Sequence, residues 1–145
     1  MPRPLLRVWP RLGDRLALAP LGAFPTPVEP LAALEGERSI SRLFVKRDDL
    51  SSPLYGGNKV RTLEVLFGRA RAEGAESIVA TGAFGSNHAV ATVLHAPRIG
   101  LAPGALLFAQ PRSWAALENL RVTLARARFL RVLPHWSLFP FGLLL

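Results

Sequence analysis

Apolar residues recur along the chain in two patterns after residue 42. Short apolar runs predict β-strands at 43–49, 77–81, 104–110 and 129–134. Apolar residues at helical spacing predict helices over 59–73, within 82–96 and over 113–128. Strands and helices alternate, so the sequence predicts an α/β fold with an open, mostly parallel sheet and flanking helices.

The first 42 residues are rich in proline and arginine and show no sustained period. They predict an extended segment that leads into the domain, with a turn and short helix in "FPTPVEPLAAL" (24–34). The run "LFVKRDD" (43–49) is predicted to be a buried strand that ends in charged residues.

Two loops between predicted strands and helices concentrate glycines and polar residues. The first contains Gly56, Gly57, Asn58 and Lys59, and the second contains Gly82, Gly85, Ser86, Asn87 and His88. In an open parallel sheet, ligands bind outside the carboxyl ends of the strands, where helix N-termini offer free amides. The two loops therefore predict a binding site, with Asn58 and either Ser86 or Asn87 as helix caps.

Lys59 has two interpretations. In the simpler one, the neighbouring polar residues only cap their helices and Lys59 is a solvated surface lysine, which the pattern alone supports equally well. In the other, the amine is desolvated, partly neutral and able to attack a carbonyl to form a Schiff base. The adjacent glycines would then let a planar cofactor approach the backbone.

Charge and composition limit the classes of partner that we expect this protein to bind. The 145 residues carry a formal net charge of +8, yet only Lys46 and Lys59 are lysines, and the arginines are scattered from Arg3 to Arg131. A nucleic-acid groove needs clustered cations and interleaved aromatic residues, so we expect no nucleic-acid partner. A basic nucleic-acid module remains the alternative that a steep salt dependence of binding would reveal.

Metal and membrane roles have little support in the sequence. The chain has no cysteine, and its three histidines lack the spacing of a zinc site. No charge-free apolar stretch reaches the roughly 18 residues needed to span a bilayer, and Pro20 and Pro25 interrupt the N-terminal run. We therefore expect a cytoplasmic protein with no metal centre and no membrane partner.

The common phosphate and nucleophile motifs do not match. "GGNKV" lacks the glycine before the lysine and the hydroxyl after it that a P-loop requires. "GAFGSN" lacks the third glycine of the dinucleotide fingerprint, and Ser86 has no flanking GxSxG pattern.

Two segments together resemble a known family. "VKRDDLSSPLYGGNKVRTLE" (45–64) and "TGAFGSNHAVAT" (81–92) look like the N-terminal half of the pyridoxal-phosphate-dependent 1-aminocyclopropane-1-carboxylate deaminase and D-cysteine desulfhydrase family. That family has the tryptophan synthase β-like fold, also called fold type II. The resemblance runs from about Thr26 through "PRSWAALENLRVTL". It implies pyridoxal 5′-phosphate as cofactor, a small amino acid as substrate, and homo-oligomeric full-length relatives.

The resemblance also implies a role for each polar residue. Lys59 would form the Schiff base with the cofactor and later move a substrate proton, and Asn58 would help to position the cofactor. Asn87 would hydrogen-bond the phenolic oxygen of the cofactor. Ser86 would contact the substrate carboxylate or transfer a proton, and His88 would line the same pocket.

The resemblance leaves the substrate open. Ser-Asn-His at 86–88 looks more like the D-cysteine desulfhydrase branch than the ring-opening deaminases, in which we expect glutamine in place of His88. Thr62 stands where the family usually has a basic residue, and Phe84-Gly85 replaces an apolar-Gln pair.

Length sets a further expectation. Family members are more than twice as long, and the glycine-rich loop that holds the cofactor phosphate lies in their C-terminal half. We expect residues 1–50 to begin the large domain and 51–145 to supply most of the smaller α/β domain. The uncharged apolar end of the sequence fits a truncated lyase or deaminase that releases ammonia and a 2-oxo acid. The alternative is a non-catalytic α/β fragment or binding subunit that keeps the motifs.

Overall fold

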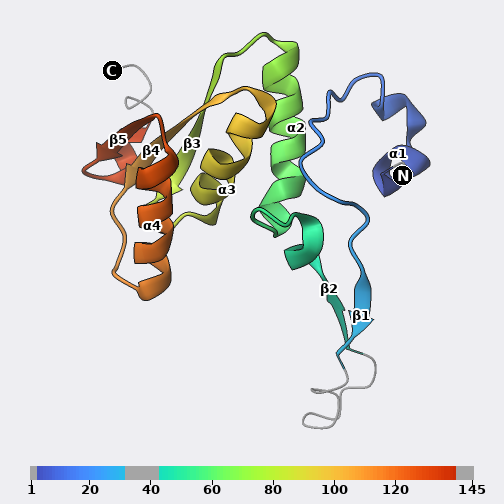
Figure 1. Cartoon of the computed structure of the whole chain (residues 1–145), viewed down its shortest axis with the longest axis horizontal. Coiled ribbons are helices and arrows are strands. Elements are labelled where there is room, and N and C mark those ends of the chain that lie inside the picture. Colours follow the sequence, from blue (N-terminus) through green and yellow to red (C-terminus); the bar gives the residue numbers. More distant parts are fainter. Residues whose placement is uncertain (1–2, 32–42, 140–145) are drawn as a thin grey trace.

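A three-stranded parallel sheet forms the centre of the structure, a computed structural model that describes residues 3–31 and 43–139. Its strands are β3 (Ser77–Ala83), β4 (Ala102–Phe108) and β5 (Phe129–Leu133), which lie side by side in that order (Figure 1). The predicted α/β fold with a parallel sheet is therefore confirmed.

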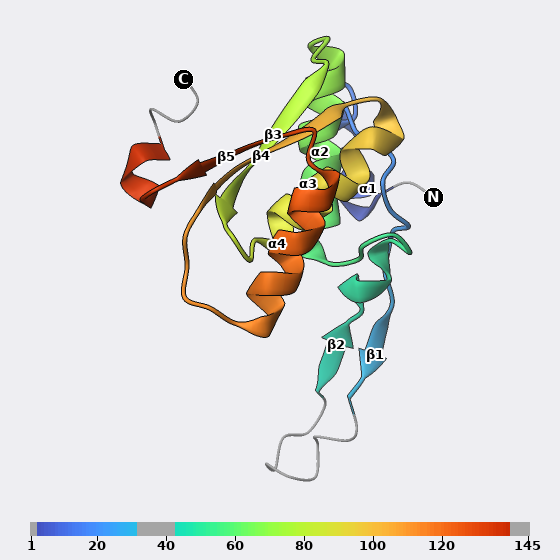
Figure 2. The ribbon, with the colours of Figure 1, turned by 60° about the vertical axis from the view of Figure 1, so that its left-hand side comes forward.

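Two helices connect these strands and cover one face of the sheet. α3 (Asn87–His95) follows β3, and α4 (Trp114–Arg126) follows β4. Ala89 of α3 packs in one cluster with inward-facing residues of the strands, and Leu120 of α4 packs against the same cluster (Figure 2). Because both crossovers lie on this face, the N-termini of α3 and α4 come close to each other at the carboxyl ends of the strands.

α2 (Asn58–Ala72) packs against α3 and is held from its other side by the N-terminal segment. The Glu64 side chain is 1% exposed, and its Oε1 accepts hydrogen bonds from the backbone amides of Leu21 (3.1 Å) and Gly22 (3.2 Å). Its Oε2 pairs with Arg3. A buried carboxylate needs such donors, so Glu64 ties the N-terminal segment to α2.

Helix boundaries agree with the sequence pattern to within a few residues. α2 ends at Ala72, and Gly74 follows with a φ of +74°, as expected of a helix stop. Ser86 caps α3 by accepting a hydrogen bond from the amide of Ala89 (3.2 Å). This outcome decides between the two predicted caps in favour of Ser86.

The predictions for the N-terminal part hold only in part: a strand forms within 43–49, but it is not buried and does not join the parallel sheet. β2 (Phe44–Lys46) pairs antiparallel with β1 (Val28–Pro30) in a separate two-stranded sheet, and neither strand is buried. The first residues include a short helix, α1 (Pro4–Val8), within the predicted extended segment. Residues 28–30 form a strand and no helix, and residues 32–34 lie outside the described part. Only residues 44–46 of the 43–49 run form a strand, and the charged residues Arg47 to Asp49 follow it.

Ion pairs at the surface connect strand β1 to the residues that follow strand β2. Arg47 Nη1 lies 2.7 Å from Glu29 Oε2, and Arg47 Nη2 lies 2.8 Å from Asp49 Oδ2. Arg47 thus links Glu29 of β1 to Asp49, which follows β2, and exposed pairs of this kind contribute little to stability.

Candidate active site

Two glycines shape the loop before α2. Gly57 is the N-cap of α2 with a φ of +125°, a conformation that other residues rarely adopt. A Cβ added to Gly56 would lie 1.8 Å from the carbonyl oxygen of Asp49. The amide of Gly57 donates to the carbonyl oxygen of Asp48 (2.7 Å) and to Ser51 Oγ (3.0 Å). These constraints fix where α2 begins and where its first side chains point.

Asn58 is not the cap of α2, contrary to the prediction. It is the first residue of the helix, and its exposed side chain has no hydrogen bond within the described part of the chain. The positive φ that ends the loop falls at Gly57, which therefore takes the cap position. The amide of Asn58 is left free, and its role towards a cofactor stays a prediction.

Lys59 lies in the first turn of α2 and is half-buried. That turn contains no acidic residue, and Lys59 has no ion pair with any described residue. The nearest glutamate on the same helix, Glu64, is occupied by the N-terminal segment. The amine is thus a half-buried cation without a counterion in residues 3–31 and 43–139.

The loop between β3 and α3 is equally tight. A Cβ on Gly82 would lie 2.7 Å from Ser86 Oγ, and a Cβ on Gly85 would lie 2.8 Å from Ala116 of α4. The backbone amide of Gly85 donates to Gln110 Oε1 (3.2 Å). Close approach on both sides therefore holds the start of α3 against β4 and α4.

His88 links the two loops electrostatically. Burial lowers the pKa of His88 below its ordinary value of 6.5, and the positive charge of Lys59 lowers it further. A group from the start of α3 and one from the start of α2 therefore lie close enough to interact. The imidazole is neutral near pH 7 and has a nitrogen that can accept a proton.

A hydrogen bond also joins the two loops directly. The hydroxyl of Tyr55 donates to Asn87 Oδ1 over 3.0 Å, and Nδ2 of Asn119 donates to the same oxygen over 2.7 Å. Burial raises the pKa of Tyr55, so the phenol stays protonated and remains a donor. Nε2 of the fully buried His95 lies 3.1 Å from the carbonyl oxygen of Tyr55 and holds its backbone.

The structure thus brings Lys59, Asn87 and His88 together, with Asn58 and Ser86 beside them. The roles of these five residues in binding and catalysis remain predictions. No local sequence signal points to Asn119, because it lies in the middle of α4. Tyr55 was not among the predicted site residues. Its place directly before the glycine pair Gly56-Gly57 is the sequence signal that could have identified it.

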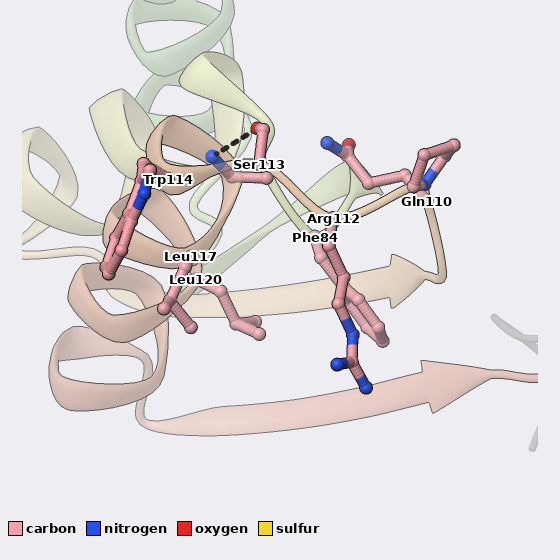
Figure 3. A pocket seen from close by; sticks show the side chains of 9 residues that line it. Phe84, Gln110, Arg112, Ser113, Trp114, Leu117 and Leu120 are labelled. Carbon is pink, nitrogen blue, oxygen red and sulfur yellow. Dashed lines mark hydrogen bonds between the residues drawn. The ribbon is translucent and has the colours of Figure 1, made fainter.

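Two cavities lie beside this site and not within it. One of about 680 Å³ is lined by Phe84, by residues 110–114 and by apolar residues of α4 (Figure 3). In Figure 3, Trp114, Leu117 and Leu120 come from α4, and Arg112 comes from the loop before it. A second cavity of about 610 Å³ lies between β3, β4 and residues 136–139. None of the five predicted site residues lines either cavity.

The described residues supply neither a metal-binding cluster nor a membrane-crossing helix. No three histidine, aspartate or glutamate side chains gather in residues 3–31 and 43–139 in a way that could hold a metal ion. No helix within these ranges has both the length and the apolar character needed to cross a membrane.

Comparison with known proteins assigns the family. The profile of the family described as "Pyridoxal-phosphate dependent enzyme" matches residues 19–123. The nocardicin C-9′ epimerase of Nocardia uniformis subsp. tsuyamanensis is 40% identical over 119 residues, which cover 82% of this chain and 35% of that protein. D-cysteine desulfhydrase of Salmonella paratyphi C is 42% identical over 83 residues, covering 57% of this chain and 25% of the relative.

Other relatives carry the deaminase name. A putative 1-aminocyclopropane-1-carboxylate deaminase of Pyrococcus abyssi is 41% identical over 93 residues, which cover 64% of this chain and 26% of the relative. The crystal structure of an ACC deaminase homologue superposes with a TM-score of 0.77 at 30% identity, covering 91% of this chain and 40% of the solved one. The chain spans about a quarter to a third of the length of these curated relatives. On this evidence the chain belongs to the family of pyridoxal-phosphate-dependent enzymes.

Proposed function

We propose that this chain carries the lysine-bearing part of a pyridoxal-phosphate-dependent lyase or deaminase that acts on a small amino acid. One observation carries the proposal. Lys59, at the start of α2, is half-buried and has no counterion in the described residues, and its charge acts on His88 at the start of α3.

The residues present fit the cofactor. Lys59 offers an amine that no carboxylate neutralises, and Asn87 keeps its Nδ2 without a partner in the described residues. A Cβ on Gly57 would meet nothing within 4 Å, so a flat ring could approach the backbone there. When bound, pyridoxal phosphate supplies a carbonyl for the lysine and a conjugated electron sink.

Each residue of the chain then has a defined task. Lys59 would hold the cofactor through its Nζ, and the free amine would accept or return a proton at that atom. Asn87 donates through Nδ2, and His88, neutral near pH 7, accepts a proton or hydrogen bond at its free ring nitrogen. Ser86 keeps its hydroxyl hydrogen available, because its Oγ only accepts in the cap.

The proposed substrates are D-cysteine and 1-aminocyclopropane-1-carboxylate. With one water, D-cysteine would give pyruvate, ammonia and hydrogen sulfide, and the cyclic substrate would give 2-oxobutanoate and ammonia. The names of the desulfhydrase and deaminase relatives support these two choices.

Covalent trapping tests the proposal. Purified chain with pyridoxal phosphate should develop a visible absorption band, and borohydride should fix the label to Lys59, which peptide mapping identifies. Lys59→Ala should lose the label. Lys46→Ala is the matched control, because Lys46 is the other lysine of the sequence and binds the carbonyl oxygen of Thr26. A label that survives in Lys59→Ala would contradict the assignment.

An epimerase is the second candidate function. Of the curated relatives named above by sequence, the nocardicin C-9′ epimerase aligns over the largest share of this chain, 82%. Epimerisation removes an α proton and returns it to the opposite face, which requires two proton-transfer groups. Lys59 and the neutral His88 are two such groups within electrostatic reach of each other. Deuterium uptake at the α carbon without ammonia release would favour the epimerase, and ammonia release would favour the lyase or deaminase.

A further inference from the structure

Asn119 of α4 stands between a backbone carbonyl and the site. Its Nδ2 lies 2.9 Å from the carbonyl oxygen of Gly85 and 2.7 Å from Oδ1 of Asn87. A peptide carbonyl only accepts hydrogen bonds, so the Asn119 atom that faces it must be the amide nitrogen. That nitrogen only donates, so the Asn87 atom that faces it must be the carbonyl oxygen. Gly85 therefore determines the orientation of Asn119, and Asn119 determines the orientation of Asn87.

Tyr55 strengthens the same orientation from the other junction. Its hydroxyl lies 3.0 Å from Asn87 Oδ1, so two donors converge on an oxygen with two lone pairs. A flipped Asn87 would turn its own NH2 group towards the NH2 group of Asn119, with donor facing donor. The observed orientation leaves Asn87 Nδ2 without a partner in the described part of the chain.

The support behind Asn119 is rigid. Gly85 is pinned through its amide by Gln110, and a Cβ on Gly85 would lie 2.8 Å from Ala116 of α4. Thr123 is fully buried one turn further along α4, and its Oγ1 donates to the carbonyl oxygen of Asn119 (2.9 Å). The loop and the helix thus cannot separate without breaking contacts on both sides.

We propose that Asn119, assisted by Tyr55, is a positioning residue that holds the Asn87 amide so that Nδ2 is the donor presented to the ring oxygen of the cofactor. This inference rests on the proposed function, because it assumes a cofactor attached to Lys59. It assigns a role to α4, a helix that lies outside both the 56–59 and the 82–88 segments.

The orientation can be tested without any cofactor. In the ¹³C,¹⁵N-labelled chain, couplings transmitted across hydrogen bonds should connect ¹⁵Nδ2 of Asn119 to the side-chain carbonyl carbon of Asn87 and to the carbonyl carbon of Gly85. Coupling in the opposite sense, from Nδ2 of Asn87 to the side-chain carbonyl carbon of Asn119, would overturn the inference. This measurement uses the wild-type chain, so it does not depend on a variant that folds.

The consequence for the cofactor is tested by a pH titration of the visible band. A donor at the ring oxygen stabilises that oxygen best when it carries a full negative charge, which is after the lysine-linked nitrogen has lost its proton. Asn119→Leu, an uncharged change that keeps the number of side-chain heavy atoms but removes the donor, lets Asn87 turn away. The midpoint of the titration should therefore rise, by up to about one pH unit.

The control is Leu124→Ala, which changes an exposed side chain of the same helix that takes no part in holding Asn119 or Asn87. It should keep the wild-type midpoint. If Asn119→Leu also keeps it while the band forms normally, the inference fails and the proposed function stands. If the wild-type chain forms no band at Lys59, the proposed function fails, and the coupling experiment still decides the orientation of Asn87.

Discussion

The site has two loops that lead into helices, here called the first junction (before α2) and the second junction (before α3). They are stabilised in different ways. The loop before α2 takes its shape from the backbone, through the positive φ of Gly57 and the contact of Gly56 with Asp49. The loop before α3 is also crowded at Gly82 and Gly85, but side-chain hydrogen bonds add to its support, through the Ser86 cap and through Asn119, which binds the carbonyl oxygen of Gly85.

This difference predicts how each junction responds to substitution. A backbone that passes within van der Waals contact of another chain segment has no room for an added Cβ, so a small change there is costly. Side-chain hydrogen bonds contribute separately, at about 1 kcal/mol each, so the second junction should weaken in steps. Lys59 depends on the first kind of support, and Asn87 depends on the second.

The largest effect is expected for Gly56→Ala. Its Cβ would lie 1.8 Å from the carbonyl oxygen of Asp49, so the loop must move, and we expect a loss of about 3 kcal/mol in the free energy of unfolding. Urea denaturation measures it. Gly74→Ala is the control, because Gly74 has a φ of +74° and open space around it, and about 1 kcal/mol of strain is expected. Equal losses in the two variants would remove the contrast between a crowded glycine and an open one.

Acid should weaken the first junction through Asp48. Hydrogen bonds from Arg61 lower the pKa of Asp48 below its ordinary value of 3.8. Because the pKa of Asp48 is lower in the folded state, ionised Asp48 stabilises the fold when the pH is above the pKa of the unfolded chain. This stabilisation is lost as the pH falls through the pKa of the folded state. Asp48→Asn should therefore cost about 1.5 kcal/mol at pH 7. The difference from wild type should shrink as the pH falls below 3.8. Urea denaturation at several pH values tests both, and a difference that is constant with pH would contradict this account.

Breaking the cap of α3 should have a smaller effect. Ser86→Ala removes the acceptor for the amide of Ala89, at a cost of about 1 kcal/mol. Ser113 caps α4 in the same way, over 3.1 Å to the amide of Ala116, so Ser113→Ala should cost a similar amount. A much larger loss in Ser86→Ala would show that the hydroxyl supports more than its helix.

The sequence predicted the first junction better than the second. The glycine pair and the helical period of α2 are local signals, so α2 and the position of Lys59 could be predicted, although the cap was assigned one residue too late at Asn58. The bonds that orient Asn87 come from a residue 32 positions away, and no local pattern reports a contact of that range. The strand within 43–49 was predicted but not its antiparallel partner β1, because the hydrophobic pattern does not encode which strands pair.

The smallest effect should appear at the contact between the junctions. Burial lowers the pKa of His88 first and Lys59 lowers it second, so Lys59→Met should raise this pKa part of the way towards 6.5. It should stay below that value because burial persists. A lowered histidine pKa makes the folded state less stable as the pH falls below 6.5, so Lys59→Met should also lose less stability under mild acid than wild type. NMR titration of the His88 ring protons measures the first effect. Lys46→Met, which removes the same charge far from α3, should leave the titration unchanged, and an identical response in both variants would mean that the two junctions do not interact through Lys59.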